Sequence, residues 1–87
     1  MITKGKSIHN KAYSIMITML REKREDKQIT QADLAELIGV DQTIISKIEN
    51  RERRLDVIEL RMICKAMDYS FIDFISELEQ KIESKKR

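Results

Sequence analysis

The sequence predicts an all-α fold in a single domain, on the strength of three observations. The chain has 87 residues, which leaves room for one domain and little more. It contains no proline, and 37% of its residues are charged, a composition that suits helices with exposed, ion-pairing faces. Apolar residues recur at helical spacing along most of the chain, which is typical of helices with one buried face.

The first helix is expected after a flexible polar leader at residues 1–6. Ser7 can cap it, and the helix should fade in the charged run at residues 24–28. Tyr13 and Ile17 form a second apolar stripe beside the core stripe, and this second stripe is a candidate for self-association. The core stripe itself is predicted to consist of Ile8, Ala12, Ile15, Met16, Met19 and Leu20.

The second and third helices are short, and a tight turn separates them. Thr30 offers its hydroxyl to the amide of Asp33, and Gly39 supplies the left-handed residue that commonly ends a helix. Asp41 can cap the third helix, which is expected to end near Asn50. This third helix is predicted to turn Ile45 and Ile48 inward and Gln42, Thr43, Ser46 and Lys47 outward.

The fourth helix is predicted to follow a basic loop at residues 50–55. Asp56 and Glu59 have the spacing of a capping box, and after a short break Ser70 opens the fifth helix. The predicted buried positions of the fourth helix are Val57, Leu60, Ile63, Cys64 and Met67. The fifth helix carries apolar residues at Phe71, Phe74, Ile75 and Leu78, with Ile82 as a further candidate.

The folded domain is therefore expected to span residues 7–79, and residues 80–87 form a charged tail whose beginning can extend the fifth helix. Cys64 is the only cysteine and His9 the only histidine, so one chain can form neither a disulfide framework nor a tetrahedral zinc site. No nucleophile with a base and an orienting group stands out, and no phosphate-binding glycine loop is present. We expect neither an enzyme nor a bound cofactor.

The net charge and the hydropathy of the chain exclude few of the remaining classes of function. The net charge of +2 is compatible with binding a polyanion but is too small to argue for it. No apolar run approaches the roughly 20 residues that cross a bilayer, and the first residues lack the apolar block of a secretory signal. We therefore expect a cytoplasmic protein that is not embedded in a membrane.

Residues 29–54, ITQADLAELIGVDQTIISKIENRERR, place two short helices around a glycine turn, a geometry that presents the second helix to the major groove of DNA. This segment resembles the Cro and phage-repressor family of helix-turn-helix regulators, often called the XRE family. The resemblance extends from about Leu20 to Ile75. It implies a five-helix lambda-repressor-like DNA-binding domain with its helix-turn-helix at helices two and three, and double-stranded DNA as the partner.

The resemblance implies that the third helix reads base edges through Gln42, Thr43, Ser46 and Lys47. A glutamine amide can pair with adenine through two hydrogen bonds, and a threonine methyl can contact a thymine methyl. Lys47 can select guanine or hold a phosphate, and both roles stay open. Ile44 has three open alternatives: contact with a thymine methyl, packing over the second helix, or exposure to solvent.

The resemblance also implies phosphate contacts. In the family, the glutamine that corresponds to Gln31 binds a phosphate and often supports the recognition helix. Arg24 and Glu49 match positions that form a partly buried ion pair in many members, the alternative being two ordinary surface charges. The further phosphate-binding candidates, which can also be read as a solvated charge cluster, are Asn50, Arg51, Arg53 and Arg54.

The chain departs from the family pattern at several turns. Many members have glycine where this chain has Gln28, Arg51 and Asp68, so a left-handed backbone at each would cost about 1 kcal/mol. Many members also have proline where this chain has Leu55. We expect the fold to survive these departures, with turns that are strained or differently shaped.

The fifth helix carries more apolar side chains than one small domain needs, so we predict a homodimer through Phe71, Ile72, Ile75 and Leu78. Family members usually bind paired half-sites as two-fold dimers, which implies a palindromic operator. The implied function is a sequence-specific transcriptional regulator, a dimeric repressor or autoregulator in a phage, restriction-modification or antitoxin setting. The alternative is a protein-interaction module or antitoxin-like partner protein that keeps the fold and binds its partner through the apolar fifth helix.

Overall fold

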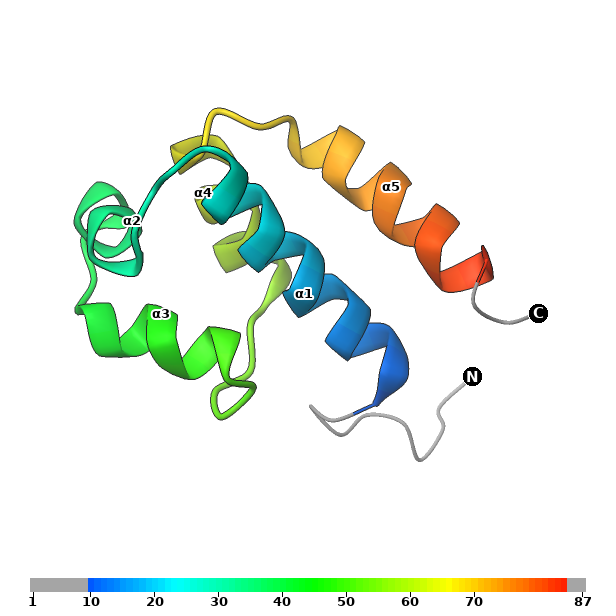
Figure 1. The fold of residues 1–87 in the computed structure, drawn as a ribbon, viewed down its shortest axis with the longest axis horizontal. Helices are drawn as coiled ribbons and strands as arrows, with labels where there is room; N and C mark the ends of the chain where they lie inside the picture. Colours follow the sequence, from blue (N-terminus) through cyan, green and yellow to red (C-terminus); the bar gives the residue numbers. More distant parts are fainter. Residues whose placement is uncertain (1–9, 85–87) are drawn as a thin grey trace.

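The computed structural model describes residues 10–84, and this part of the chain forms five helices and no strand (Figure 1). In chain order the helices are α1 (Lys11–Asp26), α2 (Gln31–Ile38), α3 (Gln42–Glu49), α4 (Val57–Ala66) and α5 (Phe71–Ser84). The predicted all-α class and the order of its elements are confirmed. Residues 80–84 belong to α5, so the expected charged tail begins as helix. None of these described helices is both long and apolar enough to cross a membrane.

α1 begins later than expected and buries a wider face than the predicted stripe, of which Met19 and Leu20 are buried as predicted. Its cap is Asn10, whose Oδ1 accepts a hydrogen bond from the Tyr13 amide at 2.8 Å. The predicted cap Ser7 and the predicted core residue Ile8 lie outside the described residues. Ala12 is exposed, and the side chains that α1 buries are Tyr13, Ile17, Met19, Leu20 and Arg24.

The expectation that Tyr13 and Ile17 form an outer stripe for self-association is therefore wrong, because both lie in the core. α1 runs through the middle of the molecule and packs against both α3 and α5 (Figure 1). Because α1 has neighbours on two sides, it buries a wider part of its surface than the single stripe that the apolar spacing predicts. Apolar spacing reveals both stripes of a helix, but it does not tell which one faces the centre.

The capping residues of α2 and α4 lie as predicted. Thr30 Oγ1 accepts a hydrogen bond from the Asp33 amide at 3.0 Å, and Asp33 Oδ2 accepts one from the Thr30 amide at 3.2 Å. Asp56 and Glu59 form the same reciprocal pair, at 2.7 and 3.1 Å. Each box satisfies two backbone N–H groups that the helix itself leaves without a partner.

The turns that follow α1 to α4 each contain a residue with left-handed backbone. These residues are Gly39, with φ of 76°, and Gln28, Arg51 and Asp68, with φ of 60°, 60° and 58°. A Cβ atom on Gly39 would meet no atom within 4 Å, so its positive φ alone favours glycine there. The other three are the positions where many members of the resembled family have glycine, and the expected left-handed backbone is present at each.

The core lies where the five helices converge, and Phe74 and Cys64 are completely buried in it. Burial raises the pKa of the Cys64 thiol to about 11, which agrees with its prediction as a small core hydrophobe. The prediction that Val57 lies in the core is wrong, because this residue is 58% exposed. The buried residue at this end of α4 is Leu55, which precedes the helix and takes the core position.

Candidate nucleic-acid interface

α3 begins at a cap that also fixes one of its predicted base-reading residues. Asp41 Oδ1 accepts hydrogen bonds from the amide and from the hydroxyl of Thr43, each at 3.0 Å. The amide first, and the hydroxyl second, hold the pKa of Asp41 below its ordinary value. Because the Thr43 hydroxyl donates to Asp41, its methyl group and oxygen lone pairs are the parts that remain for another partner.

The two sides of α3 differ in burial as predicted. Ile45 and Ile48 are 1% and 3% exposed, so both inward predictions are confirmed. Ile44 is partly buried and packs against the core, which rules out full exposure to solvent among its three alternatives. On the opposite side, one predicted base-reading residue is partly buried, Ser46, and three are exposed: Gln42, Thr43 and Lys47.

A buried polar network connects the end of α3 to α1 and α2. Arg24 Nε donates to Glu49 Oε2 at 2.7 Å, and Arg24 Nη2 donates to Glu49 Oε1 at 2.9 Å. Gln31 Nε2 donates to the same Oε1 at 2.9 Å. The third guanidinium nitrogen of Arg24, Nη1, donates to the carbonyl of Ile29 at 2.7 Å. The predicted ion pair thus exists in the structure, and Gln31 joins it.

The burial of this network gives it a strong influence on geometry. The Arg24 and Glu49 side chains are 9% and 4% exposed, so both charges depend on each other and on their hydrogen bonds for the solvation that water no longer supplies. The hydrogen bonds to Glu49 raise the pKa of Arg24. Two parallel N–H···O bonds also fix direction, because the planar guanidinium matches the planar carboxylate. The network therefore sets the orientation of α3 relative to α1.

The basic loop after α3 folds back onto its neighbours. The Arg53 amide donates to the Lys47 carbonyl at 3.2 Å. The Arg53 guanidinium binds both carboxylate oxygens of Glu59, at 3.2 and 2.7 Å, and this contact lowers the pKa of Glu59. The guanidinium of Arg54 lies over the ring of Tyr13, 5.1 Å from its centroid. Neither Glu59 as the partner of Arg53 nor Tyr13 as the partner of Arg54 was predicted from the sequence.

The four loop candidates differ in how freely they meet solvent. Asn50 and Arg54 are exposed, whereas Arg51 and Arg53 are partly buried. Arg51 lines a pocket against α1, and its Nε is buried without a hydrogen-bond partner among the described residues. Gln31 and this loop both lie against the C-terminal part of α3, because the Gln31 side chain donates to Glu49 and the Arg53 amide donates to the Lys47 carbonyl.

The predicted dimer residues on α5 also differ in exposure. Ile72 is 71% exposed and Ile75 is 37% exposed, while Phe71 and Leu78 pack partly against the core. Further large apolar side chains are exposed on α4, namely Val57, Ile58 and Met62.

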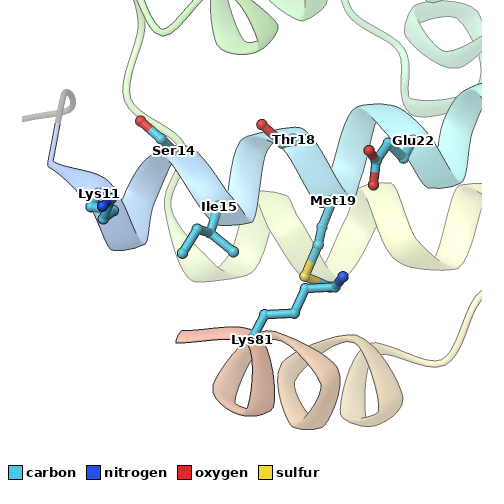
Figure 2. Close-up of a pocket in the computed structure, with 7 residues that line it drawn as sticks. All are labelled: Lys11, Ser14, Ile15, Thr18, Met19, Glu22 and Lys81. Carbon is cyan, nitrogen blue, oxygen red and sulfur yellow. The ribbon is translucent and has the colours of Figure 1, made fainter. Parts of the chain in front are cut away.

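Figure 2 shows a groove on a different part of the molecule, between α1 and α5, where Lys81 reaches toward Met19. The groove is lined only by residues of these two helices, and none of the predicted DNA-binding residues is among them: Lys11, Ser14, Ile15, Thr18, Met19, Glu22 and Lys81. Within residues 10–84, no group of three or more His, Cys, Asp or Glu side chains could hold a metal ion. The predicted base and phosphate contacts lie instead on the outer surface of α3, in the loop that follows it and at Gln31, and this is the candidate interface.

Comparison with known proteins relates this geometry to a family. A family model described as helix-turn-helix matches residues 20–74. An XRE-family like protein from Pseudomonas syringae pv. tomato str. DC3000 is 41% identical to this chain and superimposes with a TM-score of 0.81. That comparison covers 87% of this chain and 93% of the other.

A second similar structure is the wild-type restriction-modification controller protein C.Esp1396I, which is 32% identical over 82% of this chain and 91% of its own, with a TM-score of 0.74. The same controller has been solved as a tetramer in complex with its natural 35 base-pair operator. That structure is 32% identical over 82% of this chain and 93% of its own, with a TM-score of 0.73. A comparison with curated protein sequences gives no match.

Proposed function

We propose that this chain, which belongs to the XRE-type helix-turn-helix family of DNA-binding transcriptional regulators, binds a palindromic operator as a homodimer through α3. The observation that carries the proposal is that the two sides of α3 differ in burial and in polarity. One side and the end of the helix are held by core packing and by Arg24 and Gln31, while the other side exposes polar side chains. A rigid helix with an exposed polar side fits the major groove of B-DNA.

In this proposal Gln42, Thr43, Ser46 and Lys47 contact base edges. The Gln42 amide can bind adenine with two hydrogen bonds, and Lys47 can reach the acceptor atoms of guanine or a nearby phosphate. Thr43 offers its methyl group to a thymine, because its hydroxyl proton is directed to Asp41. One good two-bond contact discriminates between bases by roughly 1–3 kcal/mol.

Phosphate binding is proposed for Gln31, which keeps polar atoms beyond the Nε2 bond to Glu49, and for the loop. Arg54 is the leading loop residue because it is the exposed arginine among the loop candidates, and Asn50 and Arg51 are proposed as further phosphate contacts. Arg53 shares its charge with Glu59, so we assign it a weaker phosphate contact. Such contacts give affinity and register without reading sequence, and they make binding fall with added salt.

The homodimer is proposed to form through Phe71, Ile72, Ile75 and Leu78. The exposure of Ile72 and Ile75 supports this surface, since burying apolar area is the main driving force of association. The likeness to a controller protein that binds its operator as a tetramer supports the use of several copies on one operator. Two-fold symmetry would place two α3 helices about 34–36 Å apart, on half-sites one helical turn from each other.

A second candidate function is a protein-interaction module, and the exposed apolar side chains on α4 and α5 favour it. In that case α5 would bind a different protein, and DNA binding would be weak. Under either proposal the chain acts in the cytoplasm by binding, without catalysis and without a cofactor.

The test is selection of randomised double-stranded DNA by the purified protein at near-physiological salt, followed by titration of the enriched sequence. The leading proposal expects a palindrome with half-sites one turn apart, bound about 10³-fold or more above scrambled DNA. An absence of any enriched motif, with weak binding that salt abolishes, would favour the protein-interaction function instead.

A further inference from the structure

The loop between α3 and α4 is attached to α1 by one tyrosine. Tyr13 is 8% exposed, and its ring lies in the core. Its hydroxyl oxygen accepts a hydrogen bond from the Leu55 amide at 2.9 Å, across 42 positions of sequence. Leu55 is itself only 6% exposed, so this amide is one that water does not reach. A buried N–H without an acceptor is strongly unfavourable, and Tyr13 is the acceptor that this N–H has.

The same tyrosine contacts the residue before Leu55. The guanidinium carbon of Arg54 lies 5.1 Å from the centroid of the Tyr13 ring, within the range of a cation–π contact. Tyr13 therefore holds the backbone at position 55 with its hydroxyl and the side chain at position 54 with its ring. Arg54 remains exposed, so its charge is held in one place without being hidden from a ligand.

The neighbouring arginine does not substitute for this attachment. Arg53 binds Glu59 on α4, so its contact fixes the loop to the helix that follows it. Tyr13 fixes the loop to α1, which also carries Arg24 and so orients α3. The loop and the recognition helix thus share one support.

We propose that Tyr13 is a positioning residue for DNA binding, which sets where Arg54 presents its charge to a backbone phosphate. The proposal rests on the proposed function, because it requires the loop to lie against DNA. It assigns Tyr13 no contact with DNA and no part in choosing the base sequence. Its effect is therefore on affinity for any double-stranded DNA, and on the number of counterions that binding releases.

The experiment compares the full chain with Tyr13→Phe, which keeps the ring and removes only the hydroxyl. Dissociation constants are measured for the selected operator and for scrambled DNA at several salt concentrations. Tyr13→Phe is expected to weaken both by the same factor, about threefold to tenfold, and to lower the salt slope by up to about one. The ratio of operator to scrambled binding should stay unchanged.

Two further variants make the result specific. Arg54→Ala removes the charge itself and should show a loss at least as large as that of Tyr13→Phe. Adding Tyr13→Phe to Arg54→Ala should cause little further loss, since Tyr13 is proposed to act on DNA binding only through Arg54. Tyr69→Phe is the matched control: its hydroxyl donates to Glu77 at 3.1 Å on α5, away from the loop. It removes the same atom from another tyrosine and should leave affinity and salt slope unchanged.

The outcomes separate this proposal from the proposed function. If Arg54→Ala weakens DNA binding but Tyr13→Phe changes only the melting temperature, Tyr13 is a structural residue and the proposal is overturned. Full additivity of the two losses would overturn it as well. If the unaltered chain shows no salt-dependent binding to either DNA, the proposed function fails and this proposal fails with it.

Discussion

α3 and α5 are both amphipathic helices, yet the rest of the molecule holds them differently. α3 has eight residues and buries Ile45 and Ile48 beside the ion pair from Arg24, whose side chain is 9% exposed. α5 has 14 residues, and among them Phe74 is the one that the structure buries fully. The shorter helix is thus the more firmly fixed of the two.

The ion pair that attaches α5 to α1, between Lys23 and Glu77, is more exposed than the pair that attaches α3. Lys23 Nζ lies 2.9 Å from Glu77 Oε1, but the two side chains remain 21% and 33% exposed. Lys23 also lies 4.7 Å from the centroid of the Tyr69 ring. The residues that hold the two helices, Lys23 and Arg24, are adjacent in α1. Buried polar bonds thus fix α3, the helix that we propose presents side chains to DNA, whereas α5, with its exposed apolar residues, has a looser attachment.

The largest expected effect is that of Arg24→Ala, which leaves the Glu49 carboxylate buried without its cation. We expect the free energy of unfolding to fall by roughly 3–5 kcal/mol, measured by urea denaturation. The matched control is Arg21→Ala on the same helix, which removes a pair with Glu25 whose side chains are 60% and 51% exposed. That variant should lose at most about 0.5 kcal/mol. Equal losses of unfolding free energy in the two variants would contradict the claim that the buried ion pair holds α3 more firmly than an exposed pair would.

A smaller effect is expected from Glu77→Gln, which weakens the attachment of α5 by about 0.5–1 kcal/mol at pH 7. The hydrogen bond from Lys23 is the main reason that the pKa of Glu77 is lowered in the folded protein. A lowered pKa stabilises the fold above the unfolded value of about 4.3, and this stabilisation is lost as pH falls through the folded pKa.

The stabilities of Glu77→Gln and the unaltered chain should therefore differ at neutral pH and converge in acid, once the pH lies below the lowered pKa of Glu77, in denaturation series. The pKa of Glu59 is also lowered, so both proteins lose stability in acid as Glu59 is protonated. This loss is the same in both and does not affect the difference between their stabilities. A constant difference across the whole pH range would contradict an ionic attachment of α5.

The smallest effect on folding is expected from Ile72→Glu, at the most exposed of the predicted dimer residues. Unfolding of the dilute monomer should change by less than about 0.5 kcal/mol, because the side chain is already in water. Sedimentation at tens of micromolar should nevertheless show monomer in place of dimer. Leu37→Glu on α2, at a residue that is 60% exposed, is the control that should keep the dimer. A dimer that survives Ile72→Glu would place the interface elsewhere.

Much of this fold could be predicted from the sequence because its signals are local. Capping at Thr30 and Asp56 depends on residues three positions away, and Gly39 marks its turn by conformational freedom. The order of the helices follows from such signals. The pairing of Arg24 with Glu49 is not local, and only the family resemblance pointed to it.

Some of the contacts that sequence reasoning missed join residues far apart in the chain. The bond between Tyr13 and Leu55 requires knowing that α1 turns this side chain inward, which apolar spacing does not tell. A buried tyrosine usually finds a hydrogen-bond partner for its hydroxyl, but the sequence does not name that partner. The spacing of Asp56 and Glu59 predicts only the capping role of Glu59, whereas the contact with Arg53 depends on how the loop before α4 folds back.

The most direct test of the central claim, that the outer side of α3 reads DNA sequence, is selection of randomised DNA in parallel by the unaltered chain and by Gln42→Ala. Gln42 is exposed, so its loss should leave folding unchanged. We predict one palindrome for both proteins, with base preference lost in the variant at one symmetric pair of positions. Identical motifs with full preference at every position would contradict base reading by Gln42, and with it this assignment of α3.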